Sequence, residues 1–200
     1  MTIQPNQLYH IYNQGNNRER IFKEEIDYEV FMNKFSALAL LHGQVVCYCL
    51  MPNHFHFMIN ATESSAEPVM LGKIQSTQLS NGFRRLCSTY ANYFNKKYGR
   101  SGSLFRQKTK AKPLESEENY PMNCFHYIHQ NPLVSGLCWK MGDWEYSSFK
   151  DYCGLREQSF ITKTLAYELI GISERNFYEE SYQIIDEAII DGFSKNKTRQ

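Results

Sequence analysis

The sequence lacks the features of a membrane or secreted protein. No run of apolar residues approaches the roughly 20 that a membrane-spanning helix needs. The first residues, from Met1 to Gln7, contain neither the basic nor the apolar region of a secretory signal. These absences favour a cytoplasmic protein with no membrane partner.

The six cysteines lack the spacing of a disulfide framework or of a zinc motif. They include no C-x-x-C pair, and they are too sparse for a small secreted domain held by disulfides. Cys47 and Cys49 alternate on a predicted strand and share a face, but no second pair completes a zinc site with them. We expect reduced, mostly buried thiols.

Acidic residues are absent between Arg84 and Lys112, although the whole chain has a net charge of only +1. Nine basic residues lie in that stretch, whereas nine acidic residues outnumber six basic ones from Asp151 to the last residue. A local cluster of positive charge attracts a polyanion such as a nucleic acid. The distribution of charge therefore indicates a nucleic-acid partner, which the total charge conceals.

Length and apolar periodicity predict one α+β domain with an appendage. Of the 200 residues, 42% are hydrophobic and 14% aromatic, enough for a core, so disorder is excluded for most of the chain. Runs of β-formers predict strands, and apolar spacing near 3.6 predicts helices. The predicted elements are a strand at 8–13, a helix at about 27–41, paired strands at 44–51 and 54–60, a long helix at 69–97, a strand at 104–112 and a short helix at 116–131 that Pro132 stops.

This order of elements is typical of a ferredoxin-like, or RRM-like, antiparallel sheet with helices packed on it. We expect the main domain to cover residues 1–154. Residues 155–200 are expected to form a helical C-terminal extension with a frayed tail, because they are rich in charge and end in Lys-Asn-Lys-Thr-Arg-Gln.

His54-Phe55-His56 is the sharpest local signal. Residues two apart on a strand point the same way, so both imidazoles project from one face while Phe55 enters the core. Two neighbouring imidazoles form a natural site for a divalent metal. An isolated pair of this kind is more often structural, so a second signal is required.

The segment from Tyr127 to Pro132 supplies that signal. Tyr127 and Asn131 are i and i+4 on the predicted helix, so they share a face. The amide oxygen of Asn131 can complete a three-ligand site, with Tyr127 one turn away. A single tyrosine on a helix is more often a core aromatic, so the combination with the histidines carries the argument.

Together these segments resemble the HUH single-strand endonucleases, specifically the one-tyrosine transposases and, within them, the REP-associated tyrosine transposases. The resemblance covers about residues 8–154. It rests on five segments in the family's order: Leu8 to Gly15 with Asn17 and Phe22, Met51 to His56, Tyr93 to Gly102, Tyr127 to Pro132, and Trp144 to Phe149. This sequence departs from the family where Gln14 replaces a common arginine and where Gln107-Lys108 replaces a frequent Gly-Arg pair.

The resemblance implies a DNA transposase that nicks single-stranded DNA and transfers strands. Tyr127 is the expected nucleophile, forming a 5′-phosphotyrosine, with Mg²⁺ or Mn²⁺ held by His54, His56 and Asn131. The implied target is a palindromic DNA hairpin with an adjoining single strand. From the basic segment, the residues predicted to contact DNA phosphates are Arg84, Lys96, Lys97, Arg100, Arg106 and Lys108.

Three other functions stay open from the sequence. A non-catalytic binder of single-stranded nucleic acid explains the basic segment equally well but not the alignment of histidines and tyrosine. A metal phosphoesterase with a water nucleophile is disfavoured because no H-x-S or H-x-T motif occurs. An HUH replication initiator or relaxase is the nearest enzymatic alternative. Whether the chain acts as a monomer or a homodimer also stays open.

Overall fold

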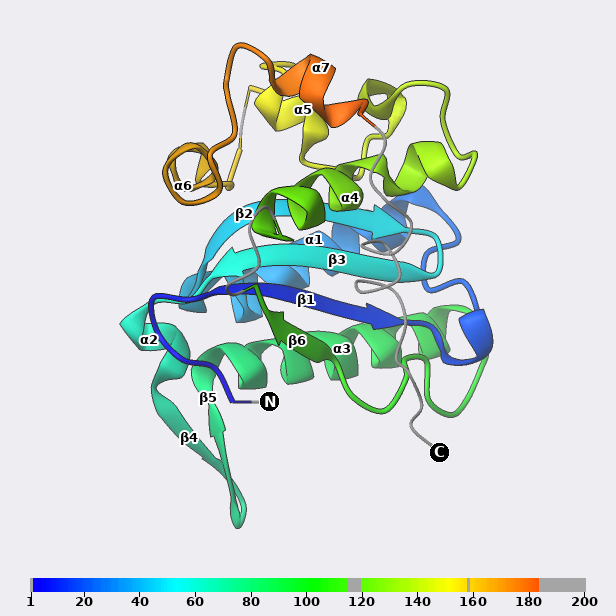
Figure 1. Ribbon diagram of the computed structural model, residues 1–200. Helices are drawn as coiled ribbons and strands as arrows, with labels where there is room; N and C mark the ends of the chain where they lie inside the picture. The colour runs from blue at the N-terminus through cyan, green and yellow to red at the C-terminus, as the bar shows by residue number, and fades with distance from the viewer. Residues whose placement is uncertain (1, 115–119, 158, 184–200) are drawn as a thin grey trace, which may run out of the picture.

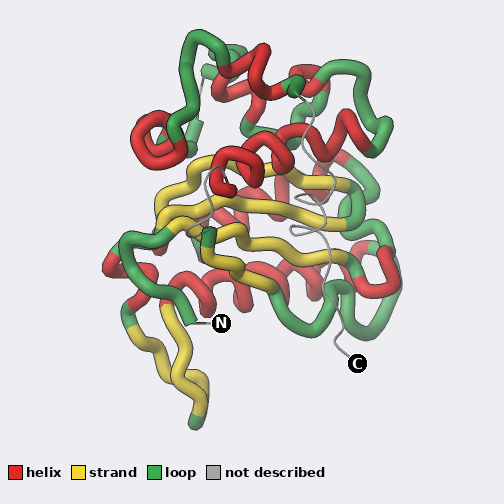
Figure 2. The backbone as a smooth tube through the Cα atoms, viewed as in Figure 1, coloured by secondary structure: helices red, strands yellow, loops and turns green. Residues whose placement is uncertain are grey.

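Four antiparallel strands form the central sheet of the protein, in the order β2-β3-β1-β6. The computed structural model describes residues 2–114, 120–157 and 159–183. The strands are β1 (Leu8–Gln14), β2 (Gln44–Met51), β3 (His54–Asn60) and β6 (Lys110–Pro113). Helices lie on both faces of the sheet (Figure 1), so the layers run helix, sheet, helix (Figure 2). This confirms the predicted α+β fold class.

Alternation along the strands separates two cores. On one face, Ile11 of β1 and Phe55 and Phe57 of β3 pack against α1 (Glu25–Leu38) and α3 (Gln78–Lys97). Gly82 allows α3 to cross α1 closely, because a Cβ at this position would lie 2.5 Å from the backbone oxygen of Leu38. The glycine that weakens helix propensity in the sequence is therefore required by packing.

On the other face, α4 (Tyr120–Val134) packs against β2. A shift in register between Val45 and Cys47 interrupts the alternation of β2, so that the neighbouring residues Val46 and Cys47 both belong to this second core. Met58 of β3 and Phe125 of α4 belong to this second core. Short elements complete it: η3 (Met141–Asp143), α5 (Phe149–Tyr152), α6 (Lys163–Leu165), η4 (Ala166–Ile170) and α7 (Phe177–Ser181). The remaining short helices are η1 (Asn16–Arg18), η2 (Leu40–His42) and α2 (Glu63–Ala66).

The predicted long helix at 69–97 is wrong over its first nine residues. Residues 68–77 form a hairpin of β4 (Pro68–Leu71) and β5 (Ile74–Thr77) that projects from the body of the molecule (Figure 1). The hairpin turns at Gly72, whose φ of 64° favours glycine. The helix begins only at Gln78, after Thr77 as its N-cap residue.

Two other predicted elements have different bounds. The strand at 104–112 is reduced to β6, because residues 103–109 follow an irregular path. The Asn13 Nδ2 donates to Thr109 Oγ1 at 3.1 Å and holds this path against β1. The helix predicted to stop before Pro132 continues to Val134, so Pro132 lies in its last turn and the helix ends two residues after it. The predicted start at residue 116 lies outside the described residues.

The described part of the C-terminal extension packs onto the second core, where Ile170 and Phe177 are buried. The predicted helices are present but short. The predicted frayed tail lies outside the described residues, and the boundary at residue 154 stays a prediction. No helix among the described ranges is long and apolar enough to cross a bilayer.

Asp27 connects α1 to the end of α3. Its fully buried carboxylate accepts hydrogen bonds from the hydroxyls of Tyr98 (2.7 Å) and Tyr93 (3.0 Å) and from the Lys97 ammonium (2.9 Å). It also accepts two from the backbone N–H groups of residues 23 and 24. Burial by itself raises the pKa of Asp27, but these hydrogen bonds outweigh burial and hold the pKa below its usual 3.8.

Replacing Asp27 with asparagine is expected to lower the free energy of unfolding by about 3 kcal/mol, because Lys97 keeps its charge without its buried partner. Urea unfolding followed by circular dichroism measures this loss. Glu24→Gln removes the exposed partner of the same lysine and is expected to cost less than about 1 kcal/mol. The contribution of Asp27 is present above pH 3.8 and is lost as the pH falls through its lowered folded-state pKa. Equal stability of the two variants would contradict the role given to Asp27.

Candidate active site

β3 presents two histidines to the face of the sheet that α4 covers. His54 and His56 alternate with Phe55 and Phe57, which point into the opposite core. The two imidazole rings meet edge to face, with their centroids 4.9 Å apart. The alternation that predicted a shared face is therefore present in the structure.

α4 carries Tyr127 and Asn131 to the same place. The ring of Tyr127 lies edge to face with that of His56, with centroids 5.6 Å apart. The side chain of Asn131 hydrogen-bonds with the Tyr127 hydroxyl and with the His54 ring. Its Nδ2 also donates to the backbone oxygen of Tyr127 at 2.7 Å, which orients the amide. The structure thus brings together all four residues predicted for the chemistry.

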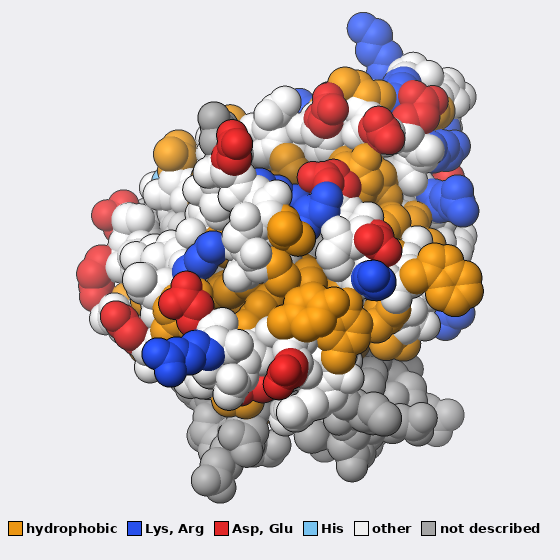
Figure 3. All heavy atoms as spheres, turned by 90° about the horizontal axis from the view of Figure 1, so that it is seen from above, with side chains coloured by type: hydrophobic (Ala, Val, Ile, Leu, Met, Phe, Trp, Pro, Cys, Tyr) orange, Lys and Arg blue, Asp and Glu red, His pale blue; other side chains and the backbone are white. Residues whose placement is uncertain are grey.

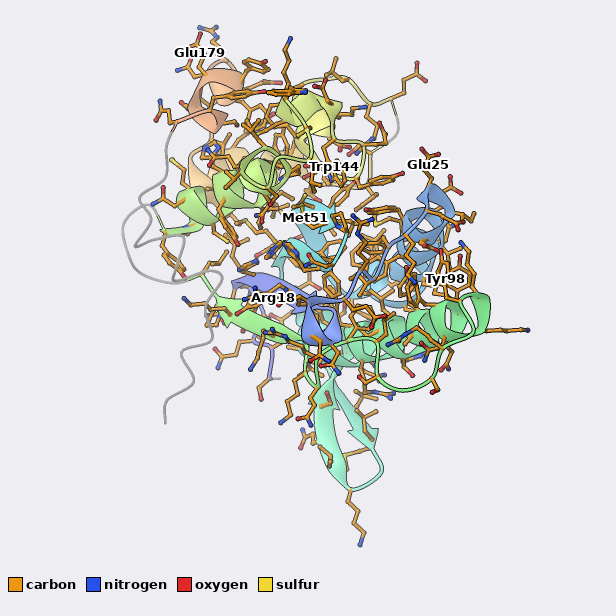
Figure 4. The ribbon with its side chains drawn as sticks, turned by 90° about the vertical axis from the view of Figure 1, so that its right-hand side faces the viewer. Arg18, Glu25, Met51, Tyr98, Trp144 and Glu179 are labelled. Carbon is orange, nitrogen blue, oxygen red and sulfur yellow. The ribbon has the colours of Figure 1, made fainter. Side chains whose placement is uncertain are left out.

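These four side chains line an open cleft of about 1150 Å³. That volume exceeds the roughly 300–1,000 Å³ of typical small-molecule sites. The cleft lies at the end of the sheet where β1 ends and β3 begins, and Figure 4 looks onto this end, with Arg18 on the adjoining turn. The other lining residues are Tyr12, Asn13, Gln14, Asn16, Arg18, Asn53, Arg106, Gln107, Lys108 and Lys110. None of the described residues that line the cleft is acidic, which suits a phosphate-bearing ligand.

Burial keeps both histidines of the site neutral. It lowers the pKa of His54 to about 4, although the hydrogen bond with Asn131 opposes the shift. Burial, followed by the neighbouring His54 and His10, holds the pKa of His56 well below its usual range. Neutral imidazole is the form that binds a metal ion, so protons do not compete for these nitrogens near neutral pH.

Burial has the opposite effect on Tyr127. It raises the pKa of the phenol to about 12, although the hydrogen bond with Asn131 opposes the shift. The hydroxyl is therefore protonated at neutral pH, and a nearby positive charge is needed to make it a nucleophile.

The donor atoms at this site fit a divalent cation. His56 Nε2 is buried, and none of the described residues hydrogen-bonds to it. Within the described ranges, no three His, Cys, Asp or Glu side chains gather into a metal cluster. A site here therefore consists of His54, His56 and the Asn131 amide, with positions left for water or phosphate. Because these donors are neutral, a bound cation retains its full charge for the phosphate.

Sequence reasoning missed His10 and Asn53, which contact the two histidines. The Nε2 of His10 lies 2.8 Å from Nδ1 of His56, and the two rings stack with centroids 5.0 Å apart. The His54 Nδ1 donates to Asn53 Oδ1 at 2.6 Å. Alternation within β1 shows that His10 shares a face with Tyr12, but only the register of β1 against β3 shows that this face meets His56.

The predicted DNA contacts separate into three groups. Arg106 and Lys108 line the cleft that holds the four predicted residues and also a neighbouring cleft of about 620 Å³, which Arg84 lines from α3. Lys96 is exposed on α3 and lines neither cleft. Lys110 also lines both clefts. Sequence reasoning did not select this residue, although it lies in the basic segment.

Lys97 and Arg100 have roles inside the fold instead. Lys97 pairs with Glu24 and Asp27 at 3.0 and 2.9 Å, and Arg100 pairs with Glu19 at 2.7 Å. These carboxylates compensate the charges of both side chains, and the role of Lys97 and Arg100 as DNA contacts stays a prediction. Their partners lie far away in the chain, so the basic segment alone did not reveal them.

The cysteines contribute no metal site among the described residues. All six are free, and Cys47 and Cys49 are buried. Burial raises the pKa of both thiols far above its usual value, so they stay protonated and behave as core residues.

Comparison with known proteins identifies two relatives of the same kind. Among curated proteins, a putative REP-associated tyrosine transposase from Haemophilus influenzae is 26% identical over 106 residues, covering 53% of this chain and 58% of that protein. The match thus spans less than two thirds of that relative. Among solved structures, a REP-associated tyrosine transposase bound to a REP hairpin matches with a TM-score of 0.57 and 14% identity, covering 81% of this chain and 94% of that one.

The resemblance to the REP-associated tyrosine transposases is confirmed. The structural match shows that this chain and that REP-associated transposase share a fold. No protein-family model matches the chain. A bacterial tRNA(His) guanylyltransferase-like protein in complex with GTP matches with a TM-score of 0.40 and 11% identity, covering 67% of this chain and 68% of that one, which is too low to carry an argument.

Proposed function

We propose that this chain cuts and rejoins single-stranded DNA through a covalent bond to Tyr127. The observation that supports this most is the convergence of Tyr127, Asn131, His54 and His56 on one open cleft, whose lining in the described part of the chain contains no acidic residue. The likeness to REP-associated tyrosine transposases, one of them solved with a REP hairpin, supports the same substrate: a DNA hairpin with an adjoining single strand.

Tyr127 supplies the nucleophile. Its hydroxyl oxygen attacks the phosphorus and loses its proton, a tyrosine–phosphorus ester forms, and the bond from phosphorus to the 3′-oxygen breaks. The leaving oxygen takes up a proton and becomes a free 3′-hydroxyl, while the 5′-phosphate stays on Tyr127. Attack by another 3′-hydroxyl reverses these bond changes, restores a phosphodiester and frees the tyrosine. Strand transfer therefore needs no external energy source.

His54, His56 and Asn131 would hold Mg²⁺ or Mn²⁺. The bound ion would withdraw charge from a non-bridging phosphate oxygen and favour ionisation of the buried phenol. Asn53 fixes the ring of His54 through its hydrogen bond to Nδ1, which leaves Nε2 as the coordinating nitrogen. Asn131 joins this site to Tyr127, so nucleophile and phosphate would be held in one geometry.

The irregular segment 103–109 is the proposed path for the DNA backbone. Arg106 and Lys108 of this segment, and Lys110 directly after it, line both clefts, so the segment borders one cleft and the other. Its base is fixed by hydrogen bonds from the Asn16 N–H to the Leu104 oxygen (2.8 Å) and from the Arg106 N–H to the Gln14 oxygen (2.9 Å). The face over α5 and α7, in contrast, mixes acidic, basic and apolar side chains (Figure 3). A polyanion is therefore expected at the clefts.

Replacing Arg106 and Lys108 together with alanine is expected to weaken binding of a labelled single-stranded hairpin. Loss of two phosphate contacts should lower the slope of log affinity against log salt concentration by about 1.4. Fluorescence anisotropy at several salt concentrations measures both effects. The matched control, Lys34→Ala with Lys140→Ala, removes the same charge outside both clefts and should leave the slope unchanged. Equal losses in the two double variants would show that only net charge matters.

Covalent capture tests the proposed reaction directly. The full chain is incubated with labelled single-stranded hairpin DNA and Mn²⁺, then denatured and separated by electrophoresis. We expect a protein-linked DNA band, and mass spectrometry of its peptides should place the phosphate on Tyr127. Cleaved DNA without any protein link would indicate a water nucleophile, and binding without cleavage under Mg²⁺ or Mn²⁺ would leave a nucleic-acid binder.

A further inference from the structure

The two histidines of the site are oriented by different kinds of partner. His54 Nδ1 faces an amide oxygen of Asn53, which can only accept, so the hydrogen of His54 lies on Nδ1. His56 Nδ1 faces Nε2 of His10 at 2.8 Å, and an imidazole nitrogen can either donate or accept. The position of the hydrogen on His56 therefore depends on His10.

We infer that His10 is a positioning residue that accepts a hydrogen bond from His56 Nδ1 and so keeps His56 Nε2 free to coordinate a cation. This inference rests on the proposed function of the site. Ligating histidines commonly donate their second ring nitrogen to such a partner, which fixes both the tautomer and the ring orientation. Here the partner is an uncharged imidazole on the neighbouring strand.

The proposed coordination sets this direction of the hydrogen bond. Burial alone does not set it, because a hydrogen lies on a buried nitrogen in either arrangement: Nε2 of His56 if His10 donates, and Nδ1 of His10 if His10 accepts. A cation on Nε2 of His56 excludes a hydrogen from that nitrogen, so a coordinating neutral His56 carries its hydrogen on Nδ1 and His10 accepts it. With the hydrogen on Nδ1, the buried Nε2 presents a lone pair beside the ring of Tyr127, where the cation is proposed to bind.

Packing against neighbouring side chains also holds the ring of His10 in place. It is fully buried, and it stacks on Tyr12 with ring centroids 4.7 Å apart and on His56 with centroids 5.0 Å apart. On β3 its cross-strand partner is Met58. This packing restricts rotation of the imidazole, so its Nε2 acts as a fixed acceptor for His56.

The first test is the tautomer of His56 in the metal-free protein, measured by NMR of protein labelled with ¹⁵N in its histidine rings. The wild-type spectrum should show a protonated Nδ1 and an unprotonated Nε2 for His56, with the signals assigned by their loss in His56→Ala. A hydrogen on Nε2 of His56 would overturn the inference. This readout needs neither DNA nor cleavage, so it is separate from the test of the proposed function.

The second test is the affinity for Mn²⁺ alone, measured by calorimetry on the full chain. His10→Phe keeps a flat ring but removes the acceptor, and should weaken Mn²⁺ binding about 10- to 100-fold. His10→Gln supplies an amide oxygen as acceptor and should restore most of the affinity. Met58→Leu perturbs the same strand pair at nearly constant volume and should bind Mn²⁺ like the wild type.

The outcomes separate positioning from simple packing. If His10→Phe binds Mn²⁺ as well as the wild type, or if His10→Gln is as weak as His10→Phe, the inference is wrong. If His10→Phe does not fold, the wild-type tautomer together with the His10→Gln affinity decides. A protein with the expected tautomer and Mn²⁺ affinities that never forms a DNA adduct would refute the proposed reaction and leave the role of His10 intact.

Discussion

Tyr127→Phe is expected to abolish covalent capture of DNA and to lower strand cleavage at least about 10⁴-fold, because the variant keeps the ring but loses the attacking oxygen. Hairpin binding should change little, since the aromatic ring and the basic lining of the cleft remain. Single-turnover cleavage of labelled hairpin DNA with Mn²⁺ measures the rate, and anisotropy measures the binding. A variant that binds but does not react is the signature of a lost nucleophile.

Tyr12→Phe is the informative comparison, because Tyr12 lines the same cleft and its ring centroid lies 5.9 Å from that of His56. The Tyr12→Phe protein should still form the adduct on Tyr127. If the adduct disappears in Tyr12→Phe and persists in Tyr127→Phe, the nucleophile is Tyr12 and the assignment is wrong. If cleavage persists in both variants without any adduct, water is the nucleophile.

His56→Ala is expected to produce the second large effect. Loss of one of the two proposed imidazole ligands should lower cleavage about 10³-fold or more, since a cation at the phosphate contributes several kcal/mol and each 1.36 kcal/mol is a factor of ten. Mn²⁺ binding to the free protein should weaken in parallel. Cleavage rates over a range of Mn²⁺ concentrations and calorimetry of Mn²⁺ binding measure the two effects.

His42→Ala is the matched control for that prediction. His42 lies in η2 and is absent from the lining of the cleft, so its loss should leave Mn²⁺ affinity and cleavage near wild-type values. If His56→Ala cleaves DNA at the wild-type rate, the histidine pair is not a metal site. The function proposed for Tyr127 would then require a different source of positive charge.

The strands that carry the site were predictable because local rules determine them. The predicted ranges 44–51 and 54–60 coincide with β2 and β3, since two runs of β-formers are separated only by Pro52 and Asn53. The i, i+4 spacing of Tyr127 and Asn131 likewise placed both on one face of α4. That the strand and the helix meet came from the resemblance to a family, because no local pattern encodes a contact between distant segments.

The features that escaped prediction depend on contacts across the chain. Residues 68–77 contain apolar side chains compatible with a helix, and the turn at Gly72 becomes decisive only where the hairpin forms. Lys97 looks like a free cation at the end of a helix, yet its buried partner Asp27 lies 70 positions away in the sequence. His10 required the register of β1 against β3.

Alternate residues of β3 have different roles: His54 and His56 line the cleft, whereas Phe55 and Phe57 pack in the aromatic core. Insertion or deletion of a single residue before this strand would exchange the two sets, sending imidazoles into the aromatic core and phenyl rings into the cleft. Such a change would remove the ligands and the stability together. The two-residue turn at Pro52 and Asn53 therefore fixes which residues of β3 face the cleft and which face the aromatic core.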